Sequence, residues 1–259
     1  MHTELKGVVL RTVDIRESDR LLTIYSDTLG LITASARGSR TLKSRKMPAT
    51  GQFCYSEFVL RSYGDKWVIS EASLIESFFG LRDSLEALSL AGYLCEIVSE
   101  VGTAEPDSDL LRLTLNSLYA LSRGTHCVGV VKAAFEMRCA SILGFMPDVH
   151  SCSRCEGTDS VGFYFDIMGG AIECYDCHNA SMEERISLSQ EHETHIVAQL
   201  TPGARAALEY SILAPIEKLF SFKLPEGEAA LFYDAAERYL LNHLERGFRS
   251  LDFYKEVTR

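Results

Sequence analysis

Two Cys-x-x-Cys pairs constrain this chain more than any other feature of its sequence. Cys152 and Cys155 form the first pair, Cys174 and Cys177 form the second, and eighteen residues separate the pairs. Each short turn brings two sulfur atoms to one point, and two such turns complete the tetrahedron that Zn²⁺ takes with thiolates. The alternative is two disulfides or four unligated thiols. We expect a metal site, with zinc as the ion, that joins two segments of the chain.

The residues between the two pairs predict a β-hairpin. Val161, Phe163 and Phe165 alternate with small or polar residues, as in a strand with one buried face. Gly169 and Gly170 suit a tight turn, after which the chain returns to the second pair. We therefore expect a zinc-ribbon-like segment at about residues 150–180.

The cysteines supply enough ligands for a closed metal site. Four thiolates fill the coordination sphere of a tetrahedral ion, whereas a catalytic zinc keeps a position open for water. The expected metal is therefore structural. His150 and His178 flank the cysteines, and either can replace one thiolate as a ligand. We expect both histidines to lie in loops that face solvent.

The N-terminal residues and the hydropathy favour an intracellular protein. Residues 1–6 contain no apolar segment typical of a signal peptide, and the sequence has no run of eighteen apolar residues. The eight cysteines then meet a reducing compartment, which favours metal binding over disulfides. We expect a cytoplasmic protein in which Cys54, Cys95, Cys127 and Cys139 are small buried apolar residues.

Charge is divided unevenly along the chain. The formal net charge of −10 is unfavourable for binding a polyanion. Residues 1–80, however, carry eleven Lys or Arg against nine Asp or Glu, and the rest carries fifteen against twenty-seven. Residues 37–46 hold five of these cations and no acid. A nucleic-acid site, if the chain has one, is expected in the N-terminal part.

The first 78 residues predict a small β-barrel. Apolar, β-branched and aromatic runs suggest strands at residues 5–11, 21–25, 31–36, 53–60 and 67–75. Residues 27–30 and 63–66 suit the turns between neighbouring strands. The commonest five-stranded barrel is the oligonucleotide-binding (OB) fold, which we expect here.

A basic loop joins the third and fourth expected strands. Its cations are Arg37, Arg40, Lys43, Arg45 and Lys46. A segment with so few apolar residues stays exposed, and it can follow a phosphate backbone without reading sequence. A solvated loop without a ligand is the alternative. Six aromatic residues of the barrel can either stack on bases or belong to the core: Tyr25, Phe53, Tyr55, Phe58, Tyr63 and Trp67.

From residue 79 the apolar spacing changes to that of helices. We expect helices over residues 81–101, 106–121, 128–143, 187–200, 202–214 and 228–246. The predicted fold class is therefore α+β. A barrel domain at residues 1–78 precedes a mostly helical domain at residues 79–259, which the metal segment interrupts.

The common catalytic motifs are missing. The sequence contains no Gly-x-x-x-x-Gly-Lys, Gly-x-Gly-x-x-Gly or Gly-x-Ser-x-Gly. The stretch His192-Glu193-Thr194-His195 is one residue shorter than the zinc-protease motif, and we interpret it as a polar helix face. We expect no enzyme, and a zinc-dependent hydrolase or transferase is the less favoured alternative.

Several motifs, taken in order, resemble the RecO family of bacterial recombination mediators. In the N-terminal part they are Glu17-Ser18-Asp19-Arg20-Leu21-Leu22, Ala36-Arg37-Gly38-Ser39-Arg40 and Lys43-Ser44-Arg45. Leu143-Gly144-Phe145 with Pro147 precedes the first cysteine pair, and Gly169-Gly170 precedes the second. The resemblance covers nearly the whole chain.

The resemblance implies a DNA repair protein without catalytic turnover. RecO-like proteins bind single- and double-stranded DNA, anneal complementary strands and act with the partner RecR. They help the RecA recombinase load onto DNA coated by single-stranded-DNA-binding protein (SSB), whose acidic tail is a family partner. The implied location is the bacterial nucleoid. We expect DNA to contact Arg37, Arg40, Lys43, Arg45, Lys46, Arg11 and Arg20. A protein-binding scaffold without DNA affinity is the alternative.

Overall fold

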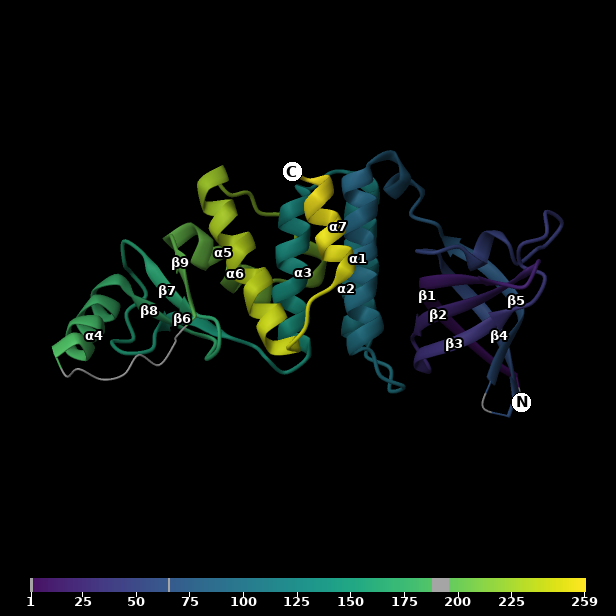
Figure 1. Cartoon of the computed structure of the whole chain (residues 1–259), viewed down its shortest axis with the longest axis horizontal. Helices are drawn as coiled ribbons and strands as arrows, with labels where there is room; N and C mark the ends of the chain where they lie inside the picture. The colour runs from purple at the N-terminus through teal and green to yellow at the C-terminus, as the bar shows by residue number, and fades with distance from the viewer. Residues whose placement is uncertain (1, 65, 188–195) are drawn as a thin grey trace. The chain divides into compact units, whose positions relative to one another are not determined.

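Figure 1 shows the chain as a computed structural model that describes residues 2–64, 66–187 and 196–259, with the backbone alone at residues 184–187. By compactness the chain divides into two units. Unit 1 holds Met1–Val128 and Phe248–Arg259, and unit 2 holds Gly129–Gly247. Both units contain strands and helices, so the predicted α+β class is confirmed. The predicted domain boundary at residue 78 stays a prediction.

Unit 1 begins with a closed five-stranded barrel. Its strands are β1 (His2–Ile15), β2 (Asp19–Ser26), β3 (Gly30–Ala36), β4 (Tyr55–Tyr63) and β5 (Lys66–Glu76). They close in the order β1-β2-β3-β5-β4, as in the predicted OB-like barrel. Neighbouring strands are antiparallel except β3 and β5, which run parallel and pair through Ala34–Trp67 and Ser35–Val68.

Apolar side chains alternate along the barrel strands and fill its interior. Leu22 and Ile24 on β2, Ala34 on β3, and Phe58 and Leu60 on β4 are all fully buried. Successive side chains of a strand point to opposite faces, so this alternation places apolar residues inside and polar residues outside. The alternation of apolar and polar residues in the sequence therefore supplies the apolar inner face on which the strands close into a barrel.

The turn before β3 requires glycine. Gly30 has a φ of +57°, and the backbone N–H of the next residue, Leu31, donates to the carbonyl oxygen of Thr103 at 2.7 Å. A Cβ atom at Gly30 would overlap that carbonyl. The barrel is thus fastened at this turn to the segment between the first two helices.

Three α-helices complete unit 1. They are α1 (Leu85–Val101), α2 (Ser108–Arg123) and α7 (Arg249–Val257), with short 3₁₀ helices η1 (Pro48–Thr50) and η2 (Phe79–Asp83). Ser84 caps α1, and Asp107 caps α2 through two backbone N–H groups. Helix α7 contacts α1, where Tyr93 and Phe248 meet edge to face at 5.6 Å. The sequence analysis did not predict α7.

In its described residues, unit 2 combines a small sheet with four α-helices. Its elements are α3 (Val128–Ile142), β6 (Asp148–Cys152), β7 (Phe163–Asp166), β8 (Ala171–Cys174), α4 (Tyr175–Ser187), β9 (Val197–Leu200), α5 (Pro202–Leu213), η3 (Ile216–Lys218) and α6 (Glu226–Leu244). The sheet has the strand order β6-β8-β7-β9, and β7 and β8 form the predicted hairpin. None of the helices in the described ranges combines the length and apolar content that a bilayer crossing needs.

Polar contacts join the helices of unit 2. Lys132 on α3 is buried, and its Nζ lies 2.8 Å from carboxylate oxygens of both Glu136 and Glu237. Arg138, also on α3, donates to the carbonyl oxygens of Ser211 at 2.9 Å and Ala214 at 2.5 Å. These bonds tie α3 to α6 and satisfy carbonyl groups at the C-terminal end of α5.

Residues 197–200 and Cys127 differ from what the sequence analysis predicted. Residues 197–200 were expected to end a helix, but they form the edge strand β9, which pairs with β7. Cys127 is exposed, whereas Cys54, Cys95 and Cys139 are buried as predicted. The stretch His192-Glu193-Thr194-His195 lies outside the described residues.

Candidate nucleic-acid interface and metal centre

The basic loop leaves the barrel at the end of β3, and its first residues are fixed by hydrogen bonds. The backbone N–H of Gly38 donates to Oδ1 of Asp19 at 2.8 Å, and the backbone N–H of Arg40 donates to the Ser18 carbonyl oxygen at 3.0 Å. The Gly38 bond holds the pKa of the Asp19 carboxyl below its usual value. The start of the loop is therefore fastened to the turn between β1 and β2.

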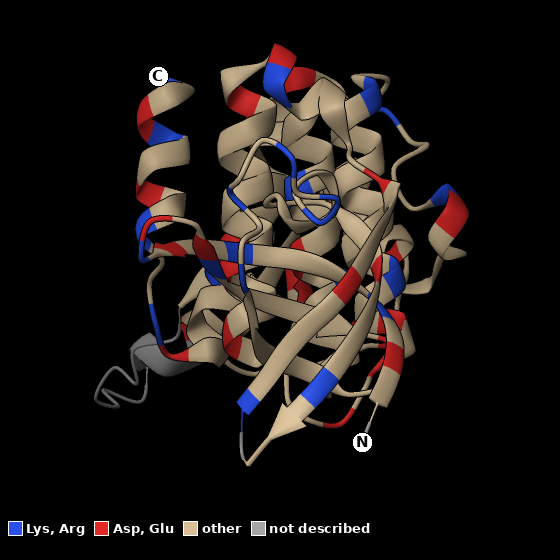
Figure 2. Ribbon diagram, turned by 90° about the vertical axis from the view of Figure 1, so that its right-hand side faces the viewer, with Lys and Arg blue, Asp and Glu red and all other residues tan. Residues whose placement is uncertain are grey.

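Four of the seven predicted DNA-contacting cations are both exposed and unpaired within the described ranges. Arg11 on β1 and Arg37, Lys43 and Arg45 on the loop are exposed. Within the described ranges, their side chains form no ion pair or hydrogen bond. Figure 2 shows Lys and Arg residues on loops in the centre of the view, with few acidic residues on the same loops.

Arg20 and Arg40 share one carboxylate on the same barrel. The Nε of Arg20 lies 3.2 Å from Oδ1 of Asp14, and the Nε of Arg40 lies 3.2 Å from Oδ2. Arg40 also donates to the carbonyl oxygens of Arg16 at 3.3 Å and Glu17 at 3.2 Å. Both guanidinium groups are partly exposed, so they remain near the loop but are engaged.

Lys46 is the least available of the seven cations. Its Nζ donates to the carbonyl oxygen of Ile69 on β5 at 3.4 Å, and the residue is half-buried. Burial lowers the pKa of its ammonium group. The candidate contacts thus range from exposed (Arg11, Arg37, Lys43 and Arg45) to inward-facing (Lys46), and their role in binding DNA stays a prediction.

The six aromatic candidates for base stacking differ in how exposed their rings are. Tyr25, Phe53 and Phe58 are at most 5% exposed, so their rings belong to the interior. Tyr63 is 62% exposed at the end of β4, beside the half-buried Trp67. Of the six aromatic residues named from the sequence, Tyr63 therefore offers the most ring surface to a ligand.

The four cysteines meet in unit 2 as the sequence predicted. Their sulfur atoms all lie within 4.8 Å of one another, and the Sγ atoms of Cys155 and Cys174 are 3.8 Å apart. A tetrahedral zinc with Zn–S bonds of about 2.3 Å requires sulfurs about 3.8 Å apart. Cys152 is the last residue of β6, Cys174 is the last residue of β8 and Cys177 lies in α4, so the hairpin sets the distance between the two pairs.

Backbone hydrogen bonds prepare the cluster for a cation. The N–H groups of Cys174 and Arg154 donate to the Sγ of Cys152 at 3.3 and 3.5 Å. Burial raises the pKa of Cys152, but hydrogen bonds from Cys174, Cys155 and Arg154 outweigh it, and the pKa falls to about 6. The thiols of Cys174 and Cys155 raise the pKa of Cys177 to about 12. Several thiolates this close together require a positive charge between them, which a metal ion supplies.

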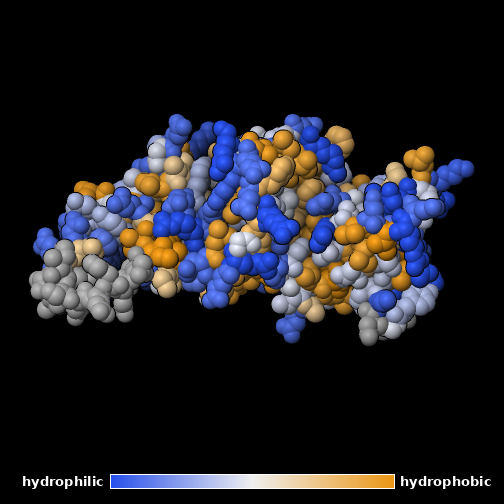
Figure 3. Space-filling view, in the orientation of Figure 1, coloured by the Kyte–Doolittle hydropathy of each residue, from blue (hydrophilic) through white to orange (hydrophobic). Residues whose placement is uncertain are grey.

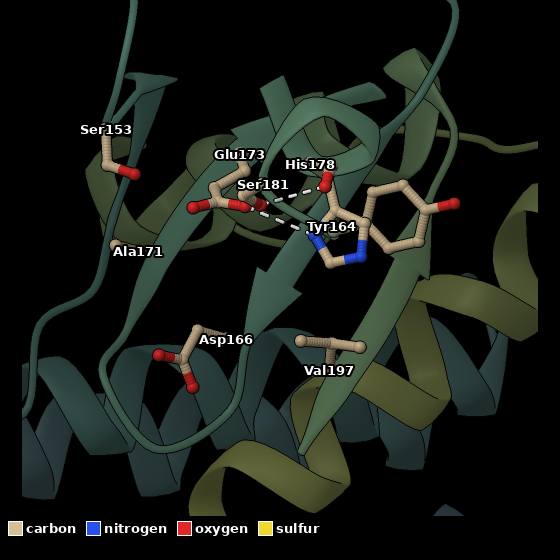
Figure 4. A pocket seen from close by; sticks show the side chains of 8 residues that line it. All are labelled: Ser153, Tyr164, Asp166, Ala171, Glu173, His178, Ser181 and Val197. Atoms are coloured by element: carbon tan, nitrogen blue, oxygen red, sulfur yellow. Dashed lines mark hydrogen bonds and ion pairs between the residues drawn. The ribbon is translucent and has the colours of Figure 1, made fainter. Parts of the chain in front are cut away.

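Glu173 and the residues around it support the second cysteine pair. Nε of Arg154 lies 2.8 Å from Oε1 of Glu173, and Nδ1 of His178 lies 3.2 Å from Oε2. Figure 4 shows the His178 ring stacked on Tyr164, with 3.7 Å between ring centroids, beside a polar pocket of about 110 Å³. His178 therefore lies on α4 and is half-buried, not in a solvent-facing loop as expected.

No histidine or carboxylate of the described chain joins the four thiols as a further candidate ligand. His150 is exposed on β6, and its Nδ1 lies 2.6 Å from Oε1 of Glu209 on α5. The donor set of four thiolates suits a closed structural site better than a catalytic one. No local sequence signal marks the supporting residues Asp14 and Tyr164, because Arg40 and His178 are distant from them along the chain.

A second, larger groove lies elsewhere in unit 2. It has a volume of about 310 Å³ and runs between α5 and the start of β6, with Met146, Ile212 and Leu213 as apolar walls. Asp148 and Glu209 add two carboxylates to its lining. Figure 3 shows hydrophobic side chains gathered over the strands of this unit on the visible face. Such a groove has the chemistry of a site for an apolar peptide segment.

Known families match both parts of the chain. The model described as recombination protein O N terminal matches residues 1–78, and the one described as recombination protein O C terminal matches residues 82–252. The protein named DNA repair protein RecO from Acetivibrio thermocellus is 33% identical over 259 residues, which cover 100% of this chain and 98% of that protein.

Two further relatives carry the same name. The protein from Desulforamulus reducens is 33% identical over 259 residues, covering 99% of this chain and 95% of its own length. The protein from Caldicellulosiruptor saccharolyticus is 28% identical over 253 residues, covering 97% of each chain. Because the family models and these relatives span barrel, helices and metal segment alike, the chain belongs to the RecO family of DNA repair proteins.

Proposed function

We propose that this protein binds single- and double-stranded DNA through the barrel and its basic loop, and anneals complementary strands without catalytic turnover. The observation that carries the proposal is the exposure of Arg11, Arg37, Lys43 and Arg45 without ion pairs in the described ranges. Cations that form no ion pair with a carboxylate can replace the counterions condensed on phosphates. A net charge of −10 on the whole chain does not prevent this, because the nearby cations dominate at short range.

Annealing follows from charge neutralisation and loose base contact. A strand held by the loop carries less net charge, so a second strand meets less repulsion. A base stacked on an exposed ring such as Tyr63 can still form a base pair, because stacking uses the face of the base and leaves its hydrogen-bonding edge free. The bound strand can therefore pair while it is held.

Salt dependence tests the proposal. Four phosphate contacts predict a slope of about −2.8 for the logarithm of single-strand affinity against the logarithm of salt, at roughly −0.7 per contact. The variant Arg37→Gln/Lys43→Gln/Arg45→Gln should flatten the slope by about 2.1 and slow the annealing of labelled complementary oligonucleotides. The matched variant Lys218→Gln/Lys223→Gln/Arg249→Gln removes three other exposed charges and should change neither. Unchanged affinity in the loop variant would reject the proposal.

We further propose that Cys152, Cys155, Cys174 and Cys177 hold one structural Zn²⁺. The mutual distances of the sulfurs and the N–H groups donated to Cys152 support this ion. When bound, zinc joins β6, the hairpin and α4, and contributes on the order of 10 kcal/mol to folding. The residues of this chain supply the thiolates and orient them; none acts on a substrate there.

For partners, we propose RecR, the acidic tail of SSB and, indirectly, RecA, with the protein working on DNA in the bacterial cytoplasm. Family membership supports these assignments. The rate at which RecA displaces SSB from labelled single-stranded DNA, with and without this protein and RecR, tests them together. A rate independent of this protein would reject the mediator role.

A protein-binding role is the second candidate function, and the groove between α5 and β6 favours it. The exposed fractions of Met146 and Leu213 are 63% and 67%, which is high for residues lining a groove. Asp148 and Glu209 make this groove a poor match for an acidic tail. If the protein shows no DNA affinity but binds RecR or SSB in pull-down experiments, the scaffold role replaces the first proposal.

A further inference from the structure

The short helix η2, between β5 and α1, presents an aromatic ring to solvent. Phe78 and Leu81 are 4% and 0% exposed, so they point into the core. A Cβ at Gly80 would overlap the carbonyl oxygen of Ser122 on α2, so this face of η2 lies directly against that helix. With its neighbours turned inward, Phe79 is turned outward and is 67% exposed.

Local hydrogen bonds fix this segment in place. Oε1 of Glu76 accepts the backbone N–H groups of Ser77 at 2.8 Å and Phe78 at 3.0 Å. Phe78 takes a left-handed backbone conformation with a φ of 45°, and its carbonyl oxygen accepts the N–H of Leu81 at 3.1 Å. The outward ring of Phe79 is therefore held in position before any ligand binds.

Two guanidinium groups lie over two exposed rings at this place. The Cζ of Arg82 is 5.6 Å from the centroid of Phe79, and the Cζ of Arg123 is 5.2 Å from the centroid of Tyr119. Tyr119 is 49% exposed, and both arginines are exposed. A guanidinium group covers one face of a ring, so exposures this large leave other ring surface open.

The two pairs belong to adjacent parts of one surface. Gly80, next to Phe79, contacts Ser122, which lies between Tyr119 and Arg123 in the last turn of α2. We call Phe79, Arg82, Tyr119 and Arg123 the Arg–aromatic surface. Figure 3 shows hydrophobic side chains at the surface over the segment that joins β5 to α1.

The charge of this surface continues toward the barrel. Burial raises the pKa of the Cys54 thiol, and the positive charges of Arg82 and Arg20 both oppose that rise. The Cys54 thiol thus lies within electrostatic range of Arg82, from the Arg–aromatic surface, and of Arg20, from the barrel. The carboxylate of Glu76 acts electrostatically on Arg123, and its Oε1 already accepts two backbone N–H groups.

We propose that the Arg–aromatic surface binds single-stranded DNA as a second contact region, with unpaired bases stacked on Phe79 and Tyr119 and phosphates bound by Arg82 and Arg123. The inference rests on the proposed DNA-binding function. Stacking needs an unpaired base, so the surface selects single strands over duplex. Exposed aromatic and arginine residues also occur in protein interfaces, but here each ring is paired with a cation that can bind the phosphate next to a stacked base.

Base stacking is tested by the variant Phe79→Ala/Tyr119→Ala and two oligonucleotides of equal length, one of thymidines and one without bases. The variant should bind the thymidine strand about tenfold or more weakly, because each stacked base contributes to affinity. It should bind the abasic strand as the unaltered protein does. Phe253→Ala removes a 50% exposed ring on α7 and is the matched control, expected to change neither affinity. Thermal unfolding of each variant verifies that it is folded.

Phosphate contact is tested by Arg82→Gln/Arg123→Gln, which should weaken the binding of both oligonucleotides. With these two contacts added to the four of the barrel, the expected salt slope is about −4.2, and the variant should flatten it by about 1.4. Lys218→Gln/Lys223→Gln is the matched control. If the loop variant weakens binding while both Arg–aromatic variants bind normally, this inference is overturned and the proposed function stands. If the loop variant is also unaffected, the proposed function fails. If the aromatic variant loses RecR or RecA binding but keeps DNA affinity, the surface is a protein interface and the inference is likewise overturned.

Discussion

Asp14 on β1 and Arg40 on the basic loop form an ion pair, with 3.2 Å between the Oδ2 and Nε atoms. The other oxygen of the same carboxylate is equally close to Arg20. One acidic residue of the barrel therefore holds two cations of the candidate DNA interface. A phosphate group that uses either arginine must compete with a carboxylate already in place.

We predict that Asp14→Asn strengthens single-stranded DNA binding. The substitution removes a negative charge beside the loop and leaves Arg20 and Arg40 able to contact phosphates. Each added contact should steepen the salt slope by about 0.7. Loss of exposed ion pairs costs only about 0.2–1 kcal/mol of stability each, so the barrel should stay folded. Fluorescence anisotropy at several salt concentrations measures the change.

The control for this prediction is Asp252→Asn, which makes the same change of net charge at an exposed position of α7. It should leave both affinity and slope as they are. An equal gain in Asp14→Asn and Asp252→Asn would mean that net charge alone acts, and no gain in Asp14→Asn would mean that the pair does not limit binding.

Metal removal should unfold part of unit 2 and leave the barrel intact. The purified protein is expected to contain one zinc per chain, measured by elemental analysis. Cys152→Ser removes the thiol that accepts two backbone N–H groups, so metal should be lost with several kcal/mol of stability. Amide hydrogen exchange should then quicken in β7 and β8 but not in β1–β5.

Cys127→Ser is the matched substitution for this experiment, because Cys127 is exposed and lies outside the cluster. It should retain the metal and the exchange pattern. A preparation without metal whose β7 and β8 amides are fully protected would contradict the structural role of the ion.

The barrel and the four-cysteine cluster could be predicted because their signals are local in the sequence. Alternating residues such as Leu22, Ile24, Phe58 and Leu60 indicate strands, and paired cysteines indicate a metal. The ion pair of Asp14 with Arg40 could not be predicted, because these residues come together only when β1, β2 and β3 pair. Contacts of this kind depend on tertiary structure and leave no pattern in the sequence.

Short elements explain the two errors in secondary structure. Helix α7 has nine residues, and its buried residues Leu251 and Tyr254 give a single apolar repeat, too short to stand out after Gly247. Strand β9 has four residues, and its burial alternates as in a half-buried strand. The polar residues before it in the sequence favour a helix, and the sequence analysis extended that helix through residue 200. Pairing with β7 decides its conformation.

We predict that Lys132→Met destabilises the protein by about 3–5 kcal/mol, since it leaves the carboxylates of Glu136 and Glu237 close together without their shared cation. Burial lowers the pKa of Lys132, but the two carboxylates outweigh it and the pKa is raised. Denaturant unfolding measures the loss. Lys223→Met, at an exposed position, should stay within about 0.5 kcal/mol of the parent.

A triple variant separates lost charge balance from lost packing. Lys132→Met/Glu136→Leu/Glu237→Leu replaces all three groups by apolar side chains and should recover most of the stability. If the triple variant is no more stable than Lys132→Met, the cost comes from packing and the electrostatic explanation is wrong.

Acid should release the start of the basic loop. The N–H of Gly38 is the main cause of the lowered pKa of Asp19; burial opposes it, and Ser18, Arg16 and Arg37 lower the pKa further. A carboxyl group with a lowered folded pKa stabilises the fold fully above its ordinary value of 3.8. That contribution is lost as the pH falls through the lower folded pKa.

Nuclear magnetic resonance of the Asp19 carboxyl and the Gly38 amide should give one shared midpoint below 3.8. In Asp19→Asn the Gly38 amide should not titrate, whereas in Asp14→Asn it should titrate as before; a midpoint at or above 3.8 would show that the hydrogen bond does not hold the loop.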